Sequence, residues 1–201
     1  TGFKWIAELV KEKEGKENYI IWGEESFGLM IGDQIRDKDA VSAVALLCEM
    51  AAYEKSKGRS LFDKMIELYM QYGFYYEHLI SITKKGMNGQ QEIAAMMEGY
   101  RKQPPTEIAG MKVVTLLDYQ LQLSTNLQTG TQTKIQLPKS NVLQFVTEDG
   151  TKISARPSGT EPKIKFYFSV NTVLPNREAF DEVYAHLQNK INNIIAAMQL
   201  N

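Results

Sequence analysis

The segment Lys152-Ile-Ser-Ala-Arg156-Pro-Ser-Gly-Thr-Glu161-Pro-Lys-Ile-Lys165-Phe-Tyr-Phe-Ser-Val170 decides the fold of the C-terminal part of this chain. Its first residues are β-rich, its centre has turn composition, and apolar and polar side chains alternate after the turn. Alternation with a period of two predicts a strand with one buried face, and Pro, Ser and Gly favour turns. The segment therefore predicts two strands joined by a tight turn. The apolar side chains expected on the buried face are Ile164, Phe166, Phe168 and Val170.

Further strands surround this unit in the sequence. We expect strands at 74–83, 112–119 and 142–147, and the central Asp-Gly of residues 148–151 is typical of a hairpin turn. Helices are expected from Asn88 to the Pro-Pro at 104–105 and from about Asn176, where apolar residues recur at helical spacing. Residues 73–201 therefore read as an α+β domain, an antiparallel sheet with helices on one face.

The first 72 residues contain helices but only one clear strand. Residues 4–13 have a helical pattern, 19–22 read as a strand, and Asp39 can cap a helix that continues to about residue 57. Ser60 and Asp63 predict a capped start for the next helix, which Gly73 ends. Because one strand cannot pair both of its edges, we expect residues 1–72 to be a truncated α/β (αβα) domain. We expect this part to be loosely held, to borrow sheet contacts from a neighbour, or to be partly disordered.

The turn in the quoted segment carries groups that suit a phosphate monoester. A guanidinium matches two phosphate oxygens, hydroxyls donate protons, and a glycine turn can aim successive N–H groups into one concavity. Lys163 and Lys165 follow two residues apart on a strand, so both can point to one face. The same residues also make an ordinary turn that binds nothing, and this alternative stays open. The turn residues concerned are Arg156, Ser158, Gly159 and Thr160.

Arg-Pro-Ser-Gly-Thr-Glu-Pro-Lys-Ile-Lys at 156–165 resembles the phosphate-binding loop in the last domain of the α-D-phosphohexomutases, the phosphoglucomutase and phosphomannomutase family. Gly-Glu-Glu-Ser-Phe-Gly at 23–28 resembles the family's sugar-binding loop, and Thr-Gly-Phe-Lys at 1–4 is similar to a segment that reaches the active site. Residues 36–41 and 137–141 add further similarity. The motifs stand in family order along nearly the whole chain, which is most similar to the long bacterial phosphoglucomutases related to phosphopentomutase.

The resemblance implies a role for individual residues. Arg156, Ser158, Gly159 and Thr160 would bind the non-transferred phosphate, with Lys165 as a second cation. The sugar hydroxyls would be bound by Glu24 and Ser26, and Lys4 would lie near the transferring phosphate as a candidate catalytic residue. Arg36 lies beside a recurring family segment, and for it we expect a structural ion pair with Asp37 or Asp39.

Two parts of the family's machinery have no counterpart in this sequence, the Ser-His-Asn segment of the phosphoserine and the Asp-rich loop that holds magnesium. The resemblance therefore implies the C-terminal part of a longer enzyme. Residues 1–72 would be the end of domain 3 and residues 73–201 domain 4. The missing N-terminal domains would be partners of this part. Mg²⁺ and glucose 1,6-bisphosphate would be cofactors of the full-length enzyme, with neither bound by this fragment.

The activity implied is an intramolecular phosphotransferase, an isomerase that interconverts glucose 1-phosphate and glucose 6-phosphate through a bisphosphorylated sugar. Catalysis would then be positioning and electrostatic stabilisation, and we expect this fragment alone to be inactive. Mannose or pentose phosphates are alternative substrates within the family. A non-catalytic phosphosugar-binding module and a scaffold with an empty turn are alternatives of other classes.

Composition limits the remaining classes. The 201 residues contain 23 Lys plus Arg and 24 Asp plus Glu, a net charge of -1, which argues against a broad nucleic-acid surface. No apolar run reaches the length of a membrane span, and a cytoplasmic enzyme without membrane partners is expected. The single Cys48 lies in an apolar helical run, so we expect it to be buried. His78 and His186 lack any pattern of metal ligands around them.

Overall fold

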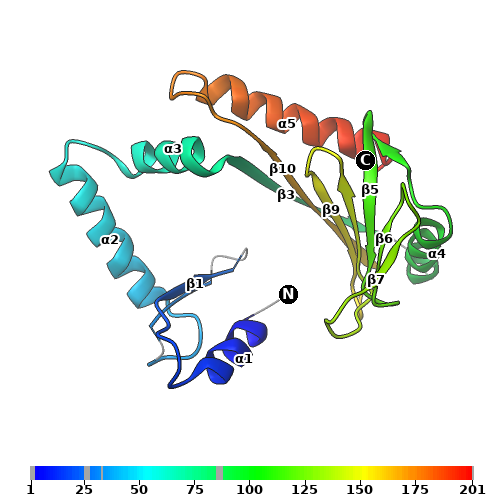
Figure 1. Ribbon diagram of the computed structural model, residues 1–201, viewed down its shortest axis with the longest axis horizontal. Helices are drawn as coiled ribbons and strands as arrows, with labels where there is room; N and C mark the ends of the chain where they lie inside the picture. The colour runs from blue at the N-terminus through cyan, green and yellow to red at the C-terminus, as the bar shows by residue number, and fades with distance from the viewer. Residues whose placement is uncertain (1–2, 25–27, 33, 85–87, 201) are drawn as a thin grey trace. The chain divides into compact units, whose positions relative to one another are not determined.

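The computed structural model describes residues 3–24, 28–32, 34–84 and 88–200 (Figure 1). The chain divides into two compact units, one ending at Met65 and the other beginning at Ile66. None of the helices among these residues has both the length and the apolar character needed to cross a membrane.

The first unit has two helices and a small hairpin before the division. Helix α1 (Lys4–Lys13) is followed by strands β1 (Ile21–Gly23) and β2 (Leu29–Ile31), which pair antiparallel with Trp22 opposite Met30. Helix α2 (Ala40–Ser56) comes next, and helix α3 (Leu61–Tyr72) contains the division between the units. The expected single strand is therefore one half of a two-stranded hairpin. The buried core of this unit consists of Phe3, Ile6, Val10 and Met30.

Two predicted helix starts in this region are confirmed. Asp39 caps α2 by accepting hydrogen bonds from the N–H groups of Val41 (3.0 Å) and Ser42 (3.1 Å). Before α3, Ser60 N–H donates to the Asp63 carboxylate at 2.7 Å, and Asp63 N–H donates back to the Ser60 hydroxyl at 3.1 Å. These bonds satisfy backbone N–H groups that have no partner inside the helix.

The expected burial of Cys48 is wrong, because its side chain is exposed. Helix α2 buries one residue among those described, Glu54, whose carboxylate accepts from Arg59 Nε at 2.8 Å just beyond the end of the helix. The apolar side chains of α2 remain in contact with solvent. Those with large exposed fractions are Val41, Val44, Leu47, Met50 and Tyr53.

The second unit is built on one antiparallel sheet, with strands in the order β3-β10-β9-β8-β5-β6-β7 and β4 paired with β5. In chain order these are β3 (Phe74–Thr83), β4 (Glu107–Ile108), β5 (Met111–Asp118), β6 (Leu123–Asn126), β7 (Gln132–Lys134), β8 (Leu143–Thr147), β9 (Lys152–Pro157) and β10 (Lys163–Thr172). Helices α4 (Gly89–Lys102) and α5 (Phe180–Ala197) pack against it (Figure 1).

The buried face of β10 confirms the alternation in the quoted segment. Ile164, Phe166, Phe168 and Val170 are fully buried, whereas Lys165 and Tyr167 on the opposite face are only partly buried. The buried strand residues join Ile93 and Met97 of α4 and side chains of α5 in one core. The α+β architecture with helices on one face of the sheet is therefore confirmed.

Candidate functional site

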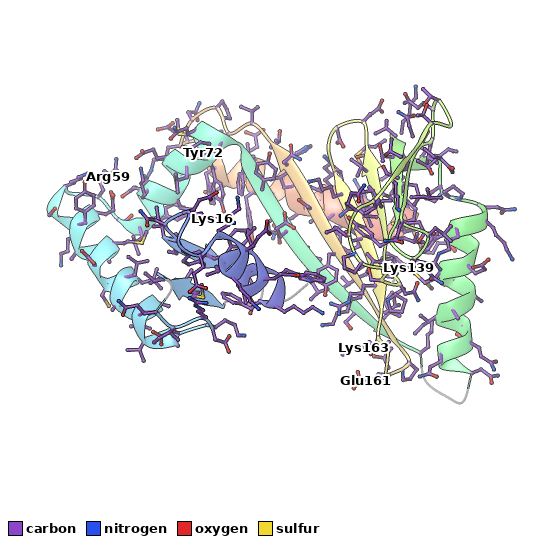
Figure 2. The ribbon with its side chains drawn as sticks, turned by 60° about the horizontal axis from the view of Figure 1, so that its bottom comes forward. Lys16, Arg59, Tyr72, Lys139, Glu161 and Lys163 are labelled. Atoms are coloured by element: carbon purple, nitrogen blue, oxygen red, sulfur yellow. The ribbon has the colours of Figure 1, made fainter. Side chains whose placement is uncertain are left out.

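The candidate phosphate loop, residues 156–165, runs from the end of β9 to the start of β10. Ser158 N–H donates to the carbonyl of Lys163 at 2.7 Å and closes the turn. Inside the turn, the Ser158 hydroxyl oxygen accepts from the N–H groups of Thr160 (3.4 Å) and Glu161 (3.2 Å). Figure 2 labels Glu161 and Lys163 at the tip of this hairpin. The turn is therefore organised around Ser158, whose hydroxyl proton remains available for donation.

Strand register brings two cations of the phosphate loop together. Arg156 on β9 lies directly opposite Lys165 on β10, and Lys165 lies opposite Ser81 on β3. Directly paired residues of an antiparallel sheet share one face, and this face is opposite the one buried by Phe166. The Arg156 side chain is exposed and Lys165 is half-buried. A guanidinium and an ammonium thus flank the open side of the turn.

Gly159 and Thr160 are both exposed at the tip of the phosphate loop. Gly159 does not adopt the left-handed conformation, and a Cβ added to it would meet no atom within 4 Å. The turn therefore does not need glycine for its backbone angles. The absence of a side chain leaves the backbone open to a ligand at this point.

In the first unit, Glu24 belongs to the loop between β1 and β2. Its N–H donates to the carbonyl of Gly28 at 2.9 Å, which holds the two ends of the candidate sugar loop, residues 23–28, together. A Cβ on Gly28 would overlap the Glu24 carboxylate and lie 2.6 Å from Lys38 Cδ, so both side chains would have to move to admit it. The predicted contact residue Ser26 lies outside the described residues.

Lys4 is the first residue of α1, and its side chain is exposed. It lines a hollow of about 390 Å³ together with Arg36, Lys38 and three other residues. The Lys4 ammonium lies 5.0 Å from the ring centroid of Trp5, within range of a cation–π contact. The structure thus places the candidate catalytic lysine beside two more cations of the same unit.

Lys38 is a residue of this hollow to which the sequence assigned no role, although it lies in the recurring segment at 36–41. Its ammonium donates to the Asp37 carboxylate at 2.8 Å and lies 5.1 Å from the Phe3 ring. The hydrogen bond to Asp37 raises the pKa of Lys38, and the same bond lowers the pKa of Asp37. Both groups therefore stay charged over a wide pH range.

The ion pair of Arg36 differs from the expected one. Arg36 pairs with Glu14 at the C-terminal end of α1, and its Nη1 lies 3.4 Å from Glu14 Oε2. The hydrogen bond and charge of Arg36 lower the pKa of Glu14. The expected partners are engaged in other contacts, Asp37 with Lys38 and Asp39 with the first turn of α2.

Residues 1–72 match the family model described as phosphoglucomutase/phosphomannomutase, alpha/beta/alpha domain III. The phosphoglucomutase of Staphylococcus aureus (strain USA300) is 39% identical over 195 residues, which are 97% of this chain and 34% of the relative. Residues 1–72 belong to domain III of the phosphoglucomutase/phosphomannomutase family. The phosphoglucomutase of Staphylococcus haemolyticus is 36% identical over 190 residues, 94% of this chain and 34% of that protein. The chain thus spans about a third of the length of these curated phosphoglucomutases.

A solved structure supports the fold of this chain. It is the open form of the exocytosis-sensitive phosphoprotein pp63/parafusin, a phosphoglucomutase from Paramecium. The match has a TM-score of 0.57 and 19% sequence identity, and it covers 99% of this chain and 33% of that chain. At this identity the likeness shows the fold alone, and both units of the chain are included in it.

Proposed function

We propose that this chain is the part of a phosphoglucomutase that binds the sugar hydroxyls and the non-transferred phosphate while glucose 1-phosphate and glucose 6-phosphate interconvert. The observation that carries the proposal is the register of the sheet, in which Arg156 lies opposite Lys165 at the mouth of a turn closed by Ser158. Two cations on paired strands beside a turn that carries a hydroxyl donor suit a doubly charged phosphate monoester.

In this proposal the phosphate loop positions the substrate. The Arg156 guanidinium binds two phosphate oxygens, Lys165 adds a point charge, and Ser158 donates its hydroxyl proton to a third oxygen. Because a mutase of this kind moves a phosphoryl group between two ends of one sugar, the same loop has to hold whichever phosphate is not reacting. The free energy of binding the non-reacting phosphate thus helps to orient the reacting end of the sugar.

The first unit supplies the sugar contacts and a candidate catalytic group. The Glu24 carboxylate accepts hydrogen bonds from sugar hydroxyls, and Ser26 contributes from the same loop. Lys4 stabilises negative charge that develops on the transferring phosphoryl group or assists proton transfer. Lys38 and Arg36 line the same hollow, each paired with a carboxylate, Asp37 and Glu14.

Magnesium and glucose 1,6-bisphosphate belong to the proposed complete enzyme. Among the residues that the structure describes, no three His, Cys, Asp or Glu side chains gather to hold a metal ion. No step through magnesium is assigned to this chain. The phosphoryl donor is assigned to a serine outside it, so the 201-residue chain alone is expected to show no mutase turnover.

The test is a titration of the chain with glucose 6-phosphate, monitored through the amide signals in NMR spectra. Binding is expected on the order of millimolar, about 4 kcal/mol, with saturable shifts at Ser158, Gly159 and Thr160. Arg156→Ala should abolish these shifts. Lys152→Ala is the matched control, because Lys152 is an exposed cation on the same strand and the same face but at the other end of β9.

Each outcome of the titration has a distinct meaning. Shifts that persist in Arg156→Ala, or that vanish equally in Lys152→Ala, would refute the assignment of the phosphate loop. Glucose without phosphate should leave the loop unchanged, and inorganic phosphate should shift it. Parallel titrations with mannose 6-phosphate and ribose 5-phosphate rank the sugars, and a clear preference for either would replace glucose in the proposal.

A further inference from the structure

Helix α4 begins against the phosphate loop with no room for a side chain. Gly89, the first residue of α4, is buried. A Cβ at this position would overlap the carbonyl oxygen of Lys84, and it would lie 3.1 Å from the carbonyl carbon of Lys84 and 3.0 Å from Pro162 Cβ. The closest of these atoms belong to the backbone, so a side-chain rotation cannot relieve the overlap.

Pro162 is itself part of the phosphate loop, and backbone bonds tie it to the same junction. Lys84 N–H donates to the carbonyl of Pro162 at 2.9 Å, directly beyond the pair formed by Thr83 and Lys163. The Lys84 ammonium lies 3.8 Å from the Glu92 carboxylate in the first turn of α4. The end of β3, the start of α4 and the phosphate loop thus meet at one packed point.

The glycine at position 89 is required by space and not by backbone angles. Gly89 has no positive φ, so alanine would favour the helix if there were room for it. Gly99 in the same helix gives the contrast, because it is exposed and a Cβ there would meet no atom within 4 Å. The two glycines of this helix therefore differ in their surroundings, because Gly89 is buried against Lys84 and Pro162 and Gly99 is exposed.

We propose that Gly89 is a positioning residue for phosphate binding. By allowing α4 to approach Lys84 and Pro162, it fixes the turn from which Ser158, Gly159 and Thr160 meet the ligand. A side chain at this position displaces Lys84 or Pro162, breaks the Lys84–Pro162 hydrogen bond and shifts the turn. This inference rests on the proposed function of the phosphate loop, and it assigns a role to a residue far from that loop in sequence.

The experiment compares Gly89→Ala with Gly99→Ala in the 201-residue chain, with inorganic phosphate and glucose 6-phosphate as probes. Gly89→Ala should weaken binding of both probes by about tenfold or more, the effect of a small misplacement of binding groups. It should also shift the free-state amide signals of residues 158–161 and 163 and speed hydrogen exchange at the Lys84 amide. Gly99→Ala should leave all three readouts unchanged and preserve or raise the melting temperature.

A role in stability alone makes a different prediction. If Gly89→Ala lowered the melting temperature but the folded fraction bound phosphate as the unchanged chain does, with Lys84 still protected, the proposal would be overturned. If Gly89→Ala does not fold, Pro162→Gly tests the same junction. It adds no atoms, and it removes the Pro162 side chain that packs beside Gly89 and Lys84. We expect weaker phosphate binding with little change in melting temperature, and unchanged binding in Pro162→Gly would count against the junction.

The two proposals fail in distinguishable ways. If the unchanged chain binds neither probe, the proposed function of the phosphate loop fails. The amide shifts at 158–161 and 163 and the Lys84 exchange rate still report whether Gly89 fixes the turn.

Discussion

Replacement of Asp118 by Asn removes a buried charge and keeps the local turn. The Asp118 carboxylate accepts from Arg101 Nε at 3.0 Å and from the N–H groups of Gln120 (2.9 Å) and Leu121 (3.2 Å). The exposed fractions of the Asp118 and Arg101 side chains are 6% and 13%. The asparagine oxygen can still accept the two N–H groups, so the substitution isolates the ion pair that joins α4 to the end of β5.

The expected loss follows from the burial of Arg101. Removing one partner of a buried pair leaves the other charge without compensation and costs about 3–5 kcal/mol. Because the turn is preserved, we expect Asp118→Asn to lower the free energy of unfolding by about 3 kcal/mol, near the lower limit of that range. Arg101→Met leaves the opposite charge unpaired and should also destabilise. The double variant has no buried charge, so it should recover about 2 kcal/mol relative to the sum of the single losses.

Urea unfolding followed by circular dichroism measures all four members of this cycle. Glu98→Ala is the matched control, because Glu98 pairs with Lys102 at 3.5 Å on the exposed face of the same helix. This substitution should lower the free energy of unfolding by no more than about 0.5 kcal/mol. A loss below about 1 kcal/mol in Asp118→Asn, or strictly additive effects in the double variant, would refute the argument that this pair is buried and coupled.

Two further predictions concern the same unit. Burial opposes ionisation of Asp149, but hydrogen bonds from Lys190 (2.6 Å), Thr147 (2.6 Å) and the Thr151 N–H (3.1 Å) outweigh it and hold the pKa of Asp149 well below its ordinary 3.8. Because the folded-state pKa is depressed, this stabilisation is complete above pH 4 and is lost as the pH falls further. The stability difference between the unchanged chain and Asp149→Asn, from urea unfolding at several pH values, should therefore shrink below about pH 4, and a difference that grew there would contradict the sign. Phe166→Ala empties a fully buried site and should cost about 3–5 kcal/mol in urea unfolding, whereas a loss below about 1 kcal/mol would contradict the burial of Phe166.

The strands that carry the core could be predicted because their apolar residues alternate. The expected strand at 74–83 matches β3, and the buried face of β10 agrees residue by residue with the sequence pattern. β6 and β7 were not predicted. Their residues, Leu-Ser-Thr-Asn and Gln-Thr-Lys, show no apolar alternation and are half-buried or exposed. Such strands are held mainly by main-chain pairing with β5 and with each other, which leaves little trace in the side-chain pattern.

Helix boundaries show the same limit. The last helix is expected from about Asn176, but regular helix begins at Phe180. The Asn176 side chain accepts from the N–H of Ala179 at 2.9 Å, so the capping chemistry is present one turn earlier than the helix. In α2 the apolar sequence predicts a buried helix, whereas Cys48 is exposed and the buried residue is Glu54. A sequence pattern shows which side chains are apolar but does not show which surfaces cover them.

The candidate phosphate site combines residues that are neighbours in sequence with a residue that is distant in sequence. The donors of the phosphate loop are contiguous in sequence, so residue types alone predict a possible anion site, whereas the assignment to a phosphosugar depends on the family resemblance. The pairing of Arg156 with Lys165 also follows from a hairpin with a short turn. That turn is supported instead by Gly89. The sequence separation between Gly89 and the turn exceeds half the length of the second unit, and Gly89 has no side chain that a sequence pattern could reveal. A glycine that is required by close packing looks the same in sequence as Gly99, where a Cβ would meet no atom within 4 Å. Only the position of Lys84 and Pro162 around it separates the two, and the comparison of Gly89→Ala with Gly99→Ala measures that difference directly.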